Sequence, residues 1–252
     1  MAMVEFSFIC PTNNMEMFET NVSASLEKQS FRDYELICVD TQKKHFSAAA
    51  DALNYGASQA SGEYLVFLHH DIVIEDTEYL TKMHDFCKKN NFLIAGAAGV
   101  LRAPVLPQLR SKIYSNIVDG PEKRGFLPVD INSVTAAEAV DECFFVIPRE
   151  VFEKRPFNHF FDTWHLYAVE YSLWAKEQGD NTVVILPFTL WHLSDGASVN
   201  QNYFDALNAL RKIYRKPIIC TMCFFPKNEL LFRLRIIYLK LYLFYHFKRR
   251  IT

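Results

Sequence analysis

Several common features are absent from this sequence, and each absence excludes a class of protein. Its 252 residues contain no low-complexity segment and no internal repeat, and 50% of them are hydrophobic. A chain of this length and composition can bury one large core or two modest ones, so we expect a folded body with little disorder. The N-terminus lacks a basic segment followed by a long apolar run, and we therefore expect no signal peptide and a cytoplasmic location.

Paired cysteines are also scarce. The six cysteines are scattered, and only Cys220 and Cys223 form a C-x-x-C pair. Because neither a second pair nor spaced histidines accompany them, no structural zinc site is expected. Several of the other cysteines lie in apolar runs, where a free thiol behaves as a small hydrophobic group. The pattern favours a reducing compartment.

The chain has almost no net charge, and its formal value of −2 argues against a nucleic-acid partner. The charge is unevenly distributed, however. Residues 206–252 carry eleven lysines and arginines against the single acid Glu229, whereas residues 1–205 carry sixteen against twenty-eight acids. The tail is therefore basic and the body acidic.

We interpret residues 217–252 as a basic, aromatic, helical tail. Its apolar stretch LLFRLRIIYLKLYLFYHF is interrupted by Arg233, Arg235 and Lys240, which argues against a membrane span. Aromatic and basic residues on one helix suit the headgroup region of a membrane, at the inner face of the cell membrane. The alternative is a helix packed on the body or on a second subunit of a homodimer, because the charges do not gather on one helical face.

In the first hundred residues, β-rich apolar runs alternate with helix-favouring segments. Strands are predicted over 4–10, 34–39 and 63–68, with helices over 15–29 and 45–60 between them. This order predicts an α/β fold with a parallel sheet covered by helices. In such sheets ligands bind beyond the carboxyl ends of the strands, which is where Asp40 and His69-His70-Asp71 lie.

The second half is less regular. A helix over 76–90 and a strand over 92–100 precede residues 101–136, which contain four prolines and are predicted to be a binding loop or lid. Regular structure then resumes, and WHLSDG is expected on a loop. The predicted elements are strands over 139–147 and 182–186, a helix over 164–178, and the loop at 191–196.

The run His69-His70-Asp71 follows an apolar strand. Side chains alternate along a strand, so His69 and Asp71 are expected to point to one side and His70 to the other. One imidazole and one carboxylate can ligate Mg²⁺ or Mn²⁺, and the imidazole favours Mn²⁺. The alternative for Asp71 is a structural one, in which its carboxylate accepts hydrogen bonds from backbone N–H groups of the next helix.

The longer motifs occur in a specific order. FSFICPTNN is followed by ELICVD, by a helix with Asn54 and Gly56, and by GEYLVFLHHDI; then come VDECFFVIPREVFEK, Trp164-His165-x-Tyr167 and WHLSDG. From about residue 4 to 215 this order resembles the inverting family 2 glycosyltransferases with the GT-A fold. Their Asp-x-Asp motif reads here as His-x-Asp, as in a bacterial glycosyltransferase-like subgroup.

The resemblance implies a GT-A domain over residues 1–216, with a Rossmann-like, mixed and mostly parallel sheet flanked by helices. Residues 1–100 would be its nucleotide-binding half and residues 101–216 its acceptor-binding half. It also implies a metal-dependent hexosyltransferase. The enzyme would move a sugar from a nucleotide donor, UDP-hexose being favoured, to a glycan or lipid-linked glycan during bacterial surface polysaccharide synthesis.

By the same resemblance, Asp71 would hold the metal ion that bridges the diphosphate of the donor. His69 stands where relatives have the first aspartate, so it would ligate the metal or hydrogen-bond the ribose. His192 lies where GT-A enzymes often supply a further ligand or diphosphate contact, and the alternative is an ordinary loop histidine.

The resemblance also assigns a nucleotide pocket. Asp40 matches the acid that recognises the uracil or ribose. Pro11 and Thr12 would line the same pocket through backbone and hydroxyl groups, and Asn54 would lie near the ribose or diphosphate.

The sequence departs from the family pattern at the general base. Relatives commonly use the Asp of a Glu-Asp pair at the start of a helix, and here that position is Ala168. Three candidates remain: Asp141, favoured for acceptor binding or as the base; Glu170, which could equally stabilise its own helix electrostatically; and His165, whose ordinary pKa is suitable. Glu142 is expected to be a solvated surface residue.

Two other functions are compatible with these residues. A non-catalytic glycan- or nucleotide-binding module would explain Ala168 and the substituted first aspartate. A nucleotidyltransferase would share the nucleotide-binding sheet and the divalent ion, but it should have a Gly-rich basic loop after the first strand, where this chain has PTNNMEMF.

Overall fold

The computed structural model describes residues 4–102, 112–125, 135–194, 200–216, 219 and 221–222. Residues 1–222 form one compact unit and residues 223–252 a second one. The Cys220–Cys223 pair and nearly all of the predicted tail 217–252, with its membrane or subunit contact, lie outside the described residues. Within the described part, no helix is long and apolar enough to cross a membrane.

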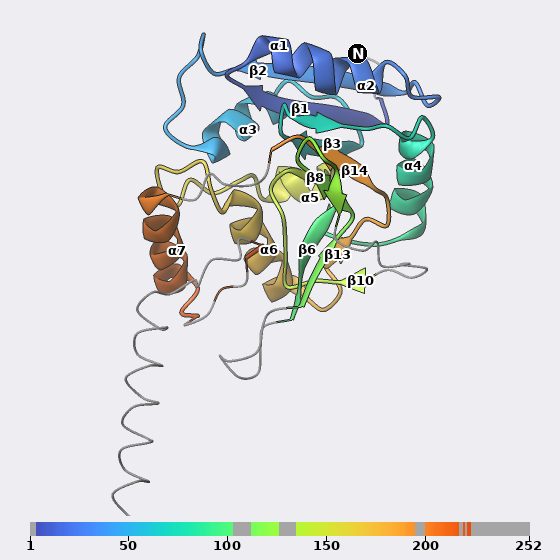
Figure 1. Ribbon diagram of the computed structural model, residues 1–252. Helices are drawn as coiled ribbons and strands as arrows, with labels where there is room; N and C mark the ends of the chain where they lie inside the picture. Colours follow the sequence, from blue (N-terminus) through green and yellow to red (C-terminus); the bar gives the residue numbers. More distant parts are fainter. Residues whose placement is uncertain are drawn as a thin grey trace, which may run out of the picture. The chain divides into compact units, whose positions relative to one another are not determined.

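A seven-stranded sheet forms the centre of the compact unit (Figure 1). Five strands run in one direction, and β12 and β10 run in the other. The sheet is therefore mixed and mostly parallel, which confirms the predicted fold class. In sheet order the strands are β10 (Thr135–Ala136), β13 (Val183–Ile185), β5 (Ile94–Gly96), β12 (Phe144–Pro148), β3 (Tyr64–Leu68), β1 (Phe6–Thr12) and β2 (Tyr34–Asp40).

Alternation along the buried strands divides the core into two layers. Val66 and Leu68 of β3 pack on one face of the sheet, whereas Leu65 and Phe67 pack on the other. The first face is covered by η1 (Phe18–Ser23), α2 (Ala24–Leu26) and α4 (Tyr79–Lys89), and the short α1 (Met15–Met17) precedes η1. The second is covered by α3 (Ala49–Ala57), α5 (Arg149–Lys154) and α6 (Tyr167–Gln178), and α7 (Gln201–Ile213) follows later in the chain.

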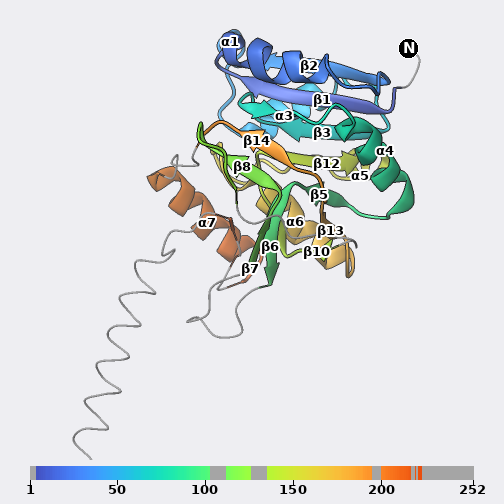
Figure 2. The ribbon, with the colours of Figure 1, turned by 45° about the vertical axis from the view of Figure 1, so that its right-hand side comes forward.

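Two small sheets extend from the central one. One contains β11 (Ala139–Val140), β6 (Ala98–Arg102) and β7 (Lys112–Ser115); the other contains β4 (Ile72–Val73), β14 (Leu190–His192), β8 (Ile117–Asp119) and β9 (Arg124–Gly125). Figure 2 shows β14 beside β8, with which it pairs in parallel.

These small sheets correct two sequence predictions. Residues 101–136 are not one irregular lid, because their described parts form strands, although 103–111 and 126–134 lie outside the described residues. Residues 191 and 192 are not on a loop, because both belong to β14. Strands of two to four residues are too short to show alternation, and their pairing partners are distant in sequence.

The predicted strand over 92–100 is divided at Ala97 between β5 and β6, which belong to different sheets. The backbone comes close to β11 at this point. A Cβ atom added at Gly96 would lie 2.5 Å from the Cβ of Val140. Only glycine permits this approach.

The predicted helices are present but shorter, and the first contains a surprise. The helical run over Met15–Leu26 includes the π-helix η1, which begins at Phe18 and ends at Ser23. Its Asn21 is buried, and the side-chain amide donates a hydrogen bond to the carbonyl oxygen of His70 at 3.4 Å. The wider turn thus connects this helix to the chain that follows β3.

Phe67 offers a test of the second core layer. Its fully buried ring contacts the rings of Phe145 and Phe157, with centroids at 5.2 and 4.9 Å. We expect Phe67→Ala to lower the free energy of unfolding by about 3–5 kcal/mol in urea denaturation, because it removes packing and leaves a cavity. The control Tyr55→Ala, at a ring that is 39% exposed, should cost about 1 kcal/mol or less. Equal losses would contradict this account of the core.

Candidate active site

Three side chains that could ligate a metal ion meet beyond the end of β3. His69, Asp71 and His192 each offer one ligand atom, and these atoms lie within 4.8 Å of one another. The first two follow β3 directly, and β14 brings the third, because His192 pairs with Ile72 of β4. His70 points elsewhere, with Nδ1 2.8 Å from Oγ1 of Thr12. The alternation expected from the sequence therefore places His69 and Asp71 together.

The buried histidine of this group lies between two carboxylates. Nε2 of His192 is 3.4 Å from Oδ2 of Asp71, and Nδ1 is 3.1 Å from Oδ1 of Asp119. Burial disfavours its charged form, but the hydrogen bonds to Asp119 and Asp71 outweigh burial and raise the pKa of His192 to about 10. Burial likewise disfavours charge on Asp71, yet the hydrogen bond and charge of His192 hold the pKa of that carboxyl well below its usual range.

His69 is held in one tautomer by Tyr167. The Tyr167 hydroxyl donates to the carbonyl oxygen of Glu142 at 3.3 Å and lies 3.1 Å from Nε2 of His69. A hydroxyl has a single proton, so Nε2–H of His69 must be the donor in the second bond, which leaves the lone pair on Nδ1. Burial lowers the pKa of His69, which favours the neutral form that ligates metals.

These residues fit a divalent ion. Two imidazoles and one carboxylate form a mixed nitrogen and oxygen donor set, which suits Mn²⁺ better than Mg²⁺. His192 would have to release the proton on Nε2 when the ion binds. The outer nitrogen of each imidazole is bonded to a neighbour, Tyr167 for His69 and Asp119 for His192. Such partners orient metal-binding histidines in many proteins. Asp119 had no signal in the sequence, and Tyr167 was singled out only as part of the motif Trp164-His165-x-Tyr167, because the relation of both residues to the histidines depends on tertiary pairing.

The predicted nucleotide residues lie at the carboxyl ends of β1 and β2. Thr12 and Asp40 are paired in register there, and Pro11 is paired with Val39. The Asp40 carboxylate bonds the Lys43 ammonium at 3.1 Å and accepts the N–H groups of Gln42 and Lys43, and these contacts lower its pKa. Thr12 is hydrogen-bonded to His70, which lies between His69 and Asp71 in the sequence. The ends of β1 and β2 therefore lie next to the segment that carries two metal-ligand candidates.

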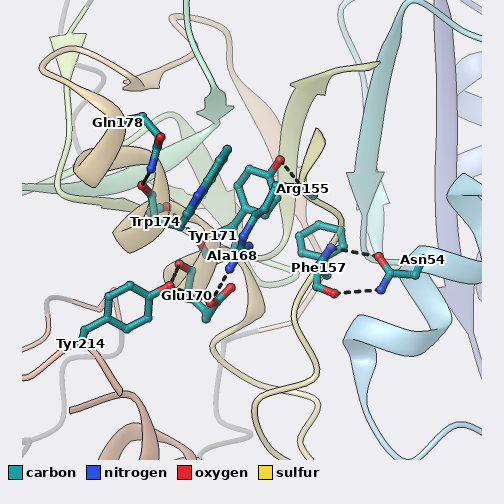
Figure 3. A network of polar contacts seen from close by, with 10 residues as sticks. Asn54, Arg155, Phe157, Ala168, Glu170, Tyr171, Trp174, Gln178 and Tyr214 are labelled. Carbon is teal, nitrogen blue, oxygen red and sulfur yellow. Dashed lines mark hydrogen bonds and ion pairs between the residues drawn. The ribbon is translucent and has the colours of Figure 1, made fainter. Parts of the chain in front are cut away.

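Asn54, predicted to lie near the ribose or diphosphate, has its side chain bonded to the chain's own backbone. Its amide donates to the carbonyl oxygen of Phe157 at 2.9 Å and accepts from the N–H of Phe157 at 3.0 Å (Figure 3). Both ends of the amide bind the chain's own backbone. Asn54 therefore fastens α3 to the segment before α6.

Two of the three predicted general bases, Glu170 and His165, have their described contacts with other parts of the chain. Glu170 is 1% exposed, and its Oε1 accepts hydrogen bonds from Arg155 at 2.6 Å and Tyr214 at 2.7 Å (Figure 3). His165 packs its ring edge-on against Tyr203, and burial lowers its pKa. Their roles in the structure are contacts within the chain.

Asp141 lies closer to the candidate ligands. It follows β11, and its carboxylate accepts the N–H of Cys143 at 2.9 Å. Its negative charge favours the charged forms of both His69 and His192. The backbone explains this placement, because the N–H of His69 donates to the carbonyl oxygen of Cys143 at 2.9 Å.

Sequence reasoning missed Glu142. It was expected to be solvated, but its Oε1 is buried and has no hydrogen-bond partner. Burial and the charge of Asp141 raise its pKa well above the usual range, although backbone N–H groups at the start of α6 oppose this shift. The error arose because the segment between β11 and β12 gives no periodic signal.

Comparison with known proteins identifies the family. The model of the glycosyltransferase-like family matches residues 7–215. The chain belongs to this family. No curated protein sequence matches it.

Solved structures share the fold at low sequence identity. Residues 1–349 of TarS from S. aureus, in complex with UDP, align with a TM-score of 0.55 and 16% identity, covering 82% of this chain and 64% of that one. GalNAc-T7 with UDP, GalNAc and Mn²⁺ aligns with a TM-score of 0.58 and 13% identity, covering 84% and 49%. This likeness confirms the GT-A fold of the glycosyltransferase domain. The chain spans less than two thirds of the length of either structure.

The Arg155–Glu170 pair generates a stability prediction. Glu170 is 1% exposed and Arg155 19% exposed at their side chains, so Arg155→Met would leave a buried carboxylate without its cation. We expect a loss of about 3–5 kcal/mol in the free energy of unfolding, measured in urea. The double variant Arg155→Met/Glu170→Leu should recover most of it, because both charges are gone. A single variant as stable as the wild type would contradict a structural role for the pair.

Proposed function

We propose that this protein is a metal-dependent, inverting glycosyltransferase that uses a nucleotide sugar, with UDP-hexose as the donor. The observation that carries the proposal is the meeting of His69, Asp71 and His192 beside the edge formed by Thr12 and Asp40. Membership of the glycosyltransferase-like family supports it. So do the similar structures, since TarS was solved with UDP and with UDP-GlcNAc, and GalNAc-T7 with UDP and Mn²⁺.

Asp71, His69 and His192 would hold Mn²⁺ or, less favourably, Mg²⁺. When bound, the ion neutralises charge that develops on the diphosphate of the donor. The chain's own residues orient the ligands and keep the carboxylate ionised. Asp119 and Tyr167 orient the two imidazoles, and the buried Asp71 carboxylate remains charged.

Asp40 and its neighbours would recognise the nucleoside. The Asp40 carboxylate is partly exposed and ionised, since its contacts lower its pKa, so it can accept hydrogen bonds from uracil or ribose. Pro11 and Thr12 end the adjacent strand and would line the same pocket. The donor would thus extend from β2 towards the residues that follow β3.

Asp141 would bind the acceptor, a glycan or lipid-linked glycan. It belongs to residues 101–216, which we propose as the acceptor-binding half, and its charge acts on His69 and His192. Synthesis of bacterial surface polysaccharide, at the cytoplasmic face of the membrane, is the setting we propose. The basic tail of residues 217–252 would supply the membrane contact, or a homodimer contact.

A non-catalytic binding module is the second candidate. Ala168, where relatives carry an acid, favours it. Metal-dependent release of nucleotide from a panel of sugar nucleotides, measured without acceptor, separates the two functions: turnover supports the enzyme, and binding without release supports the module.

Removal of the Asp71 carboxylate tests the metal site. We expect Mn²⁺ with UDP to raise the melting temperature of the wild type, because a ligand at 100 times its Kd stabilises the native state by about 2.7 kcal/mol. Asp71→Asn should abolish this increase. The control Asp76→Asn, at an exposed carboxylate paired with Lys82, should retain it. A full increase in Asp71→Asn would exclude the residue as a ligand.

Asp119 gives an independent test. Asp119→Asn keeps the shape of the side chain but removes the charge that orients His192, so the Kd for Mn²⁺ should rise about 10- to 100-fold. Titration followed by electron paramagnetic resonance measures this Kd without any turnover. An unchanged Kd would show that the hydrogen bond between Asp119 and His192 has no part in metal binding.

A further inference from the structure

The end of α7 carries an arginine in a backbone conformation that favours glycine. Arg215 is exposed and has a φ of 51°. The N–H of Lys216 donates to the carbonyl oxygen of Arg211 at 3.2 Å, which is the hydrogen bond of a Schellman motif with Arg215 at its left-handed position. Glycine is the usual residue there because it has no Cβ atom. The arginine therefore costs stability that a glycine would not, and such a cost is often retained for a function.

Two further cations lie beside Arg215. Lys212 is in the last turn of α7 and is exposed, and Lys216 is partly exposed two residues beyond the C-cap. None of the three forms an ion pair within the described part of the chain. Lys82 and Lys89 of α4, in contrast, are each paired with an acid. The end of α7 thus presents positive charge that no described carboxylate neutralises.

An apolar side chain lies among these cations. Ile213 is 50% exposed, more than any other large hydrophobic residue in the described part of the chain. Cations near a helix C-terminus stabilise the helix dipole, which accounts for Lys212. It accounts neither for an exposed isoleucine nor for an arginine beyond the helix at a glycine position. We call Lys212, Ile213, Arg215 and Lys216 the α7-end surface.

The direction of this surface is fixed by the opposite side of α7. Leu207 and Leu210 are buried, with 5% and 0% of their surface exposed. The hydroxyl of Tyr214 donates to Oε1 of Glu170 on α6 at 2.7 Å (Figure 3). These contacts hold the end of α7 against the body, so the α7-end surface faces outward.

We infer that the α7-end surface docks on the anionic headgroups of a lipid bilayer. Lysine and arginine meet the lipid phosphates, and the isoleucine reaches the boundary with the acyl chains. Charge complementarity favours this partner, because residues 206–222 carry four cations and no acid. The sequence continues into residues 223–252, which carry seven more cations against one acid. The inference rests on the membrane setting proposed above and extends the contact from the tail to the folded body.

The other end of α7 adjoins the candidate active site. The Asn202 amide donates to the carbonyl oxygen of Asp162 at 2.9 Å, and the ring of Tyr203 packs against His165, two residues before Tyr167. A helix of 13 residues spans about 20 Å. Docking through the far end of α7 would therefore hold the segment before α6 within about 20 Å of the bilayer, which suits a lipid-linked acceptor.

Arg215→Gly separates docking from folding, because glycine suits the backbone and removes the charge. We expect partition of the full chain onto vesicles of phosphatidylcholine and phosphatidylglycerol, measured by cosedimentation, to fall about fivefold. The melting temperature should rise by about 1–3 °C. Arg215→Lys should keep the partition of the wild type. The triple variant Lys212→Ala/Arg215→Gly/Lys216→Ala should lose about 100-fold.

Two controls accompany these variants. Lys89→Ala removes a cation that is 73% exposed in the last turn of α4 and should leave the partition unchanged. Vesicles of phosphatidylcholine alone should bind the wild type much less, and added salt should weaken binding to the anionic vesicles. Equal binding to both kinds of vesicle would contradict recognition of anionic headgroups.

The remaining outcomes distinguish this surface from its rivals. If the triple variant partitions like the wild type, the tail alone binds the bilayer and the inference is wrong. If Ile213→Glu turns a dimer into a monomer in analytical ultracentrifugation and leaves the partition unchanged, the surface binds a second copy and the inference is again wrong.

Nucleotide release from the panel of sugar nucleotides is measured on the same preparations. A wild type that partitions but releases no nucleotide contradicts the proposed transferase and leaves the α7-end surface standing. Release of nucleotide without partition onto anionic vesicles contradicts the surface alone.

Discussion

The antiparallel pairing of β12 with β3 is the constraint on which the site depends. Phe144 pairs with Leu68, so the residues that enter β12 lie beside the residues that leave β3. Acids at 141 and 142 are thereby held next to the candidate ligands at 69 and 71. In an all-parallel sheet the residues preceding one strand would lie at the opposite edge from those following its neighbour. The reversed strand β12 thus brings Asp141 and Glu142 to the edge where His69 and Asp71 lie.

Much of the donor half could be predicted from the sequence. Apolar runs ending at Asp40 and at His69 place these residues at the carboxyl ends of parallel strands, because that edge follows from strand order alone. The relation of His192 to Asp71 could not be derived in this way. It depends on β14, a strand of three residues whose partners come from distant parts of the chain.

The acidic residues show a second limit of sequence reasoning. Only their neighbours in space distinguish the surroundings of Glu142 from those of Glu170. Arg155 forms an ion pair with Glu170, whereas backbone N–H groups at the start of α6 face Glu142. Nothing in the local pattern distinguishes a glutamate paired with an arginine from one whose carboxylate is buried beside the start of a helix. The Asn54 amide is a similar case, since its bonds to Phe157 join residues 103 positions apart.

The number of residues in the π-helix η1 determines whether Asn21 can reach the carbonyl oxygen of His70. An α-helix advances about 100° per residue, so deletion of one residue that returned η1 to α-helical winding would rotate Asn21 away from the carbonyl oxygen of His70. The backbone between His69 and Asp71 would then lose the hydrogen bond from Asn21. A single inserted or deleted codon in this helix can therefore disturb the backbone between two candidate metal ligands that the helix itself does not supply.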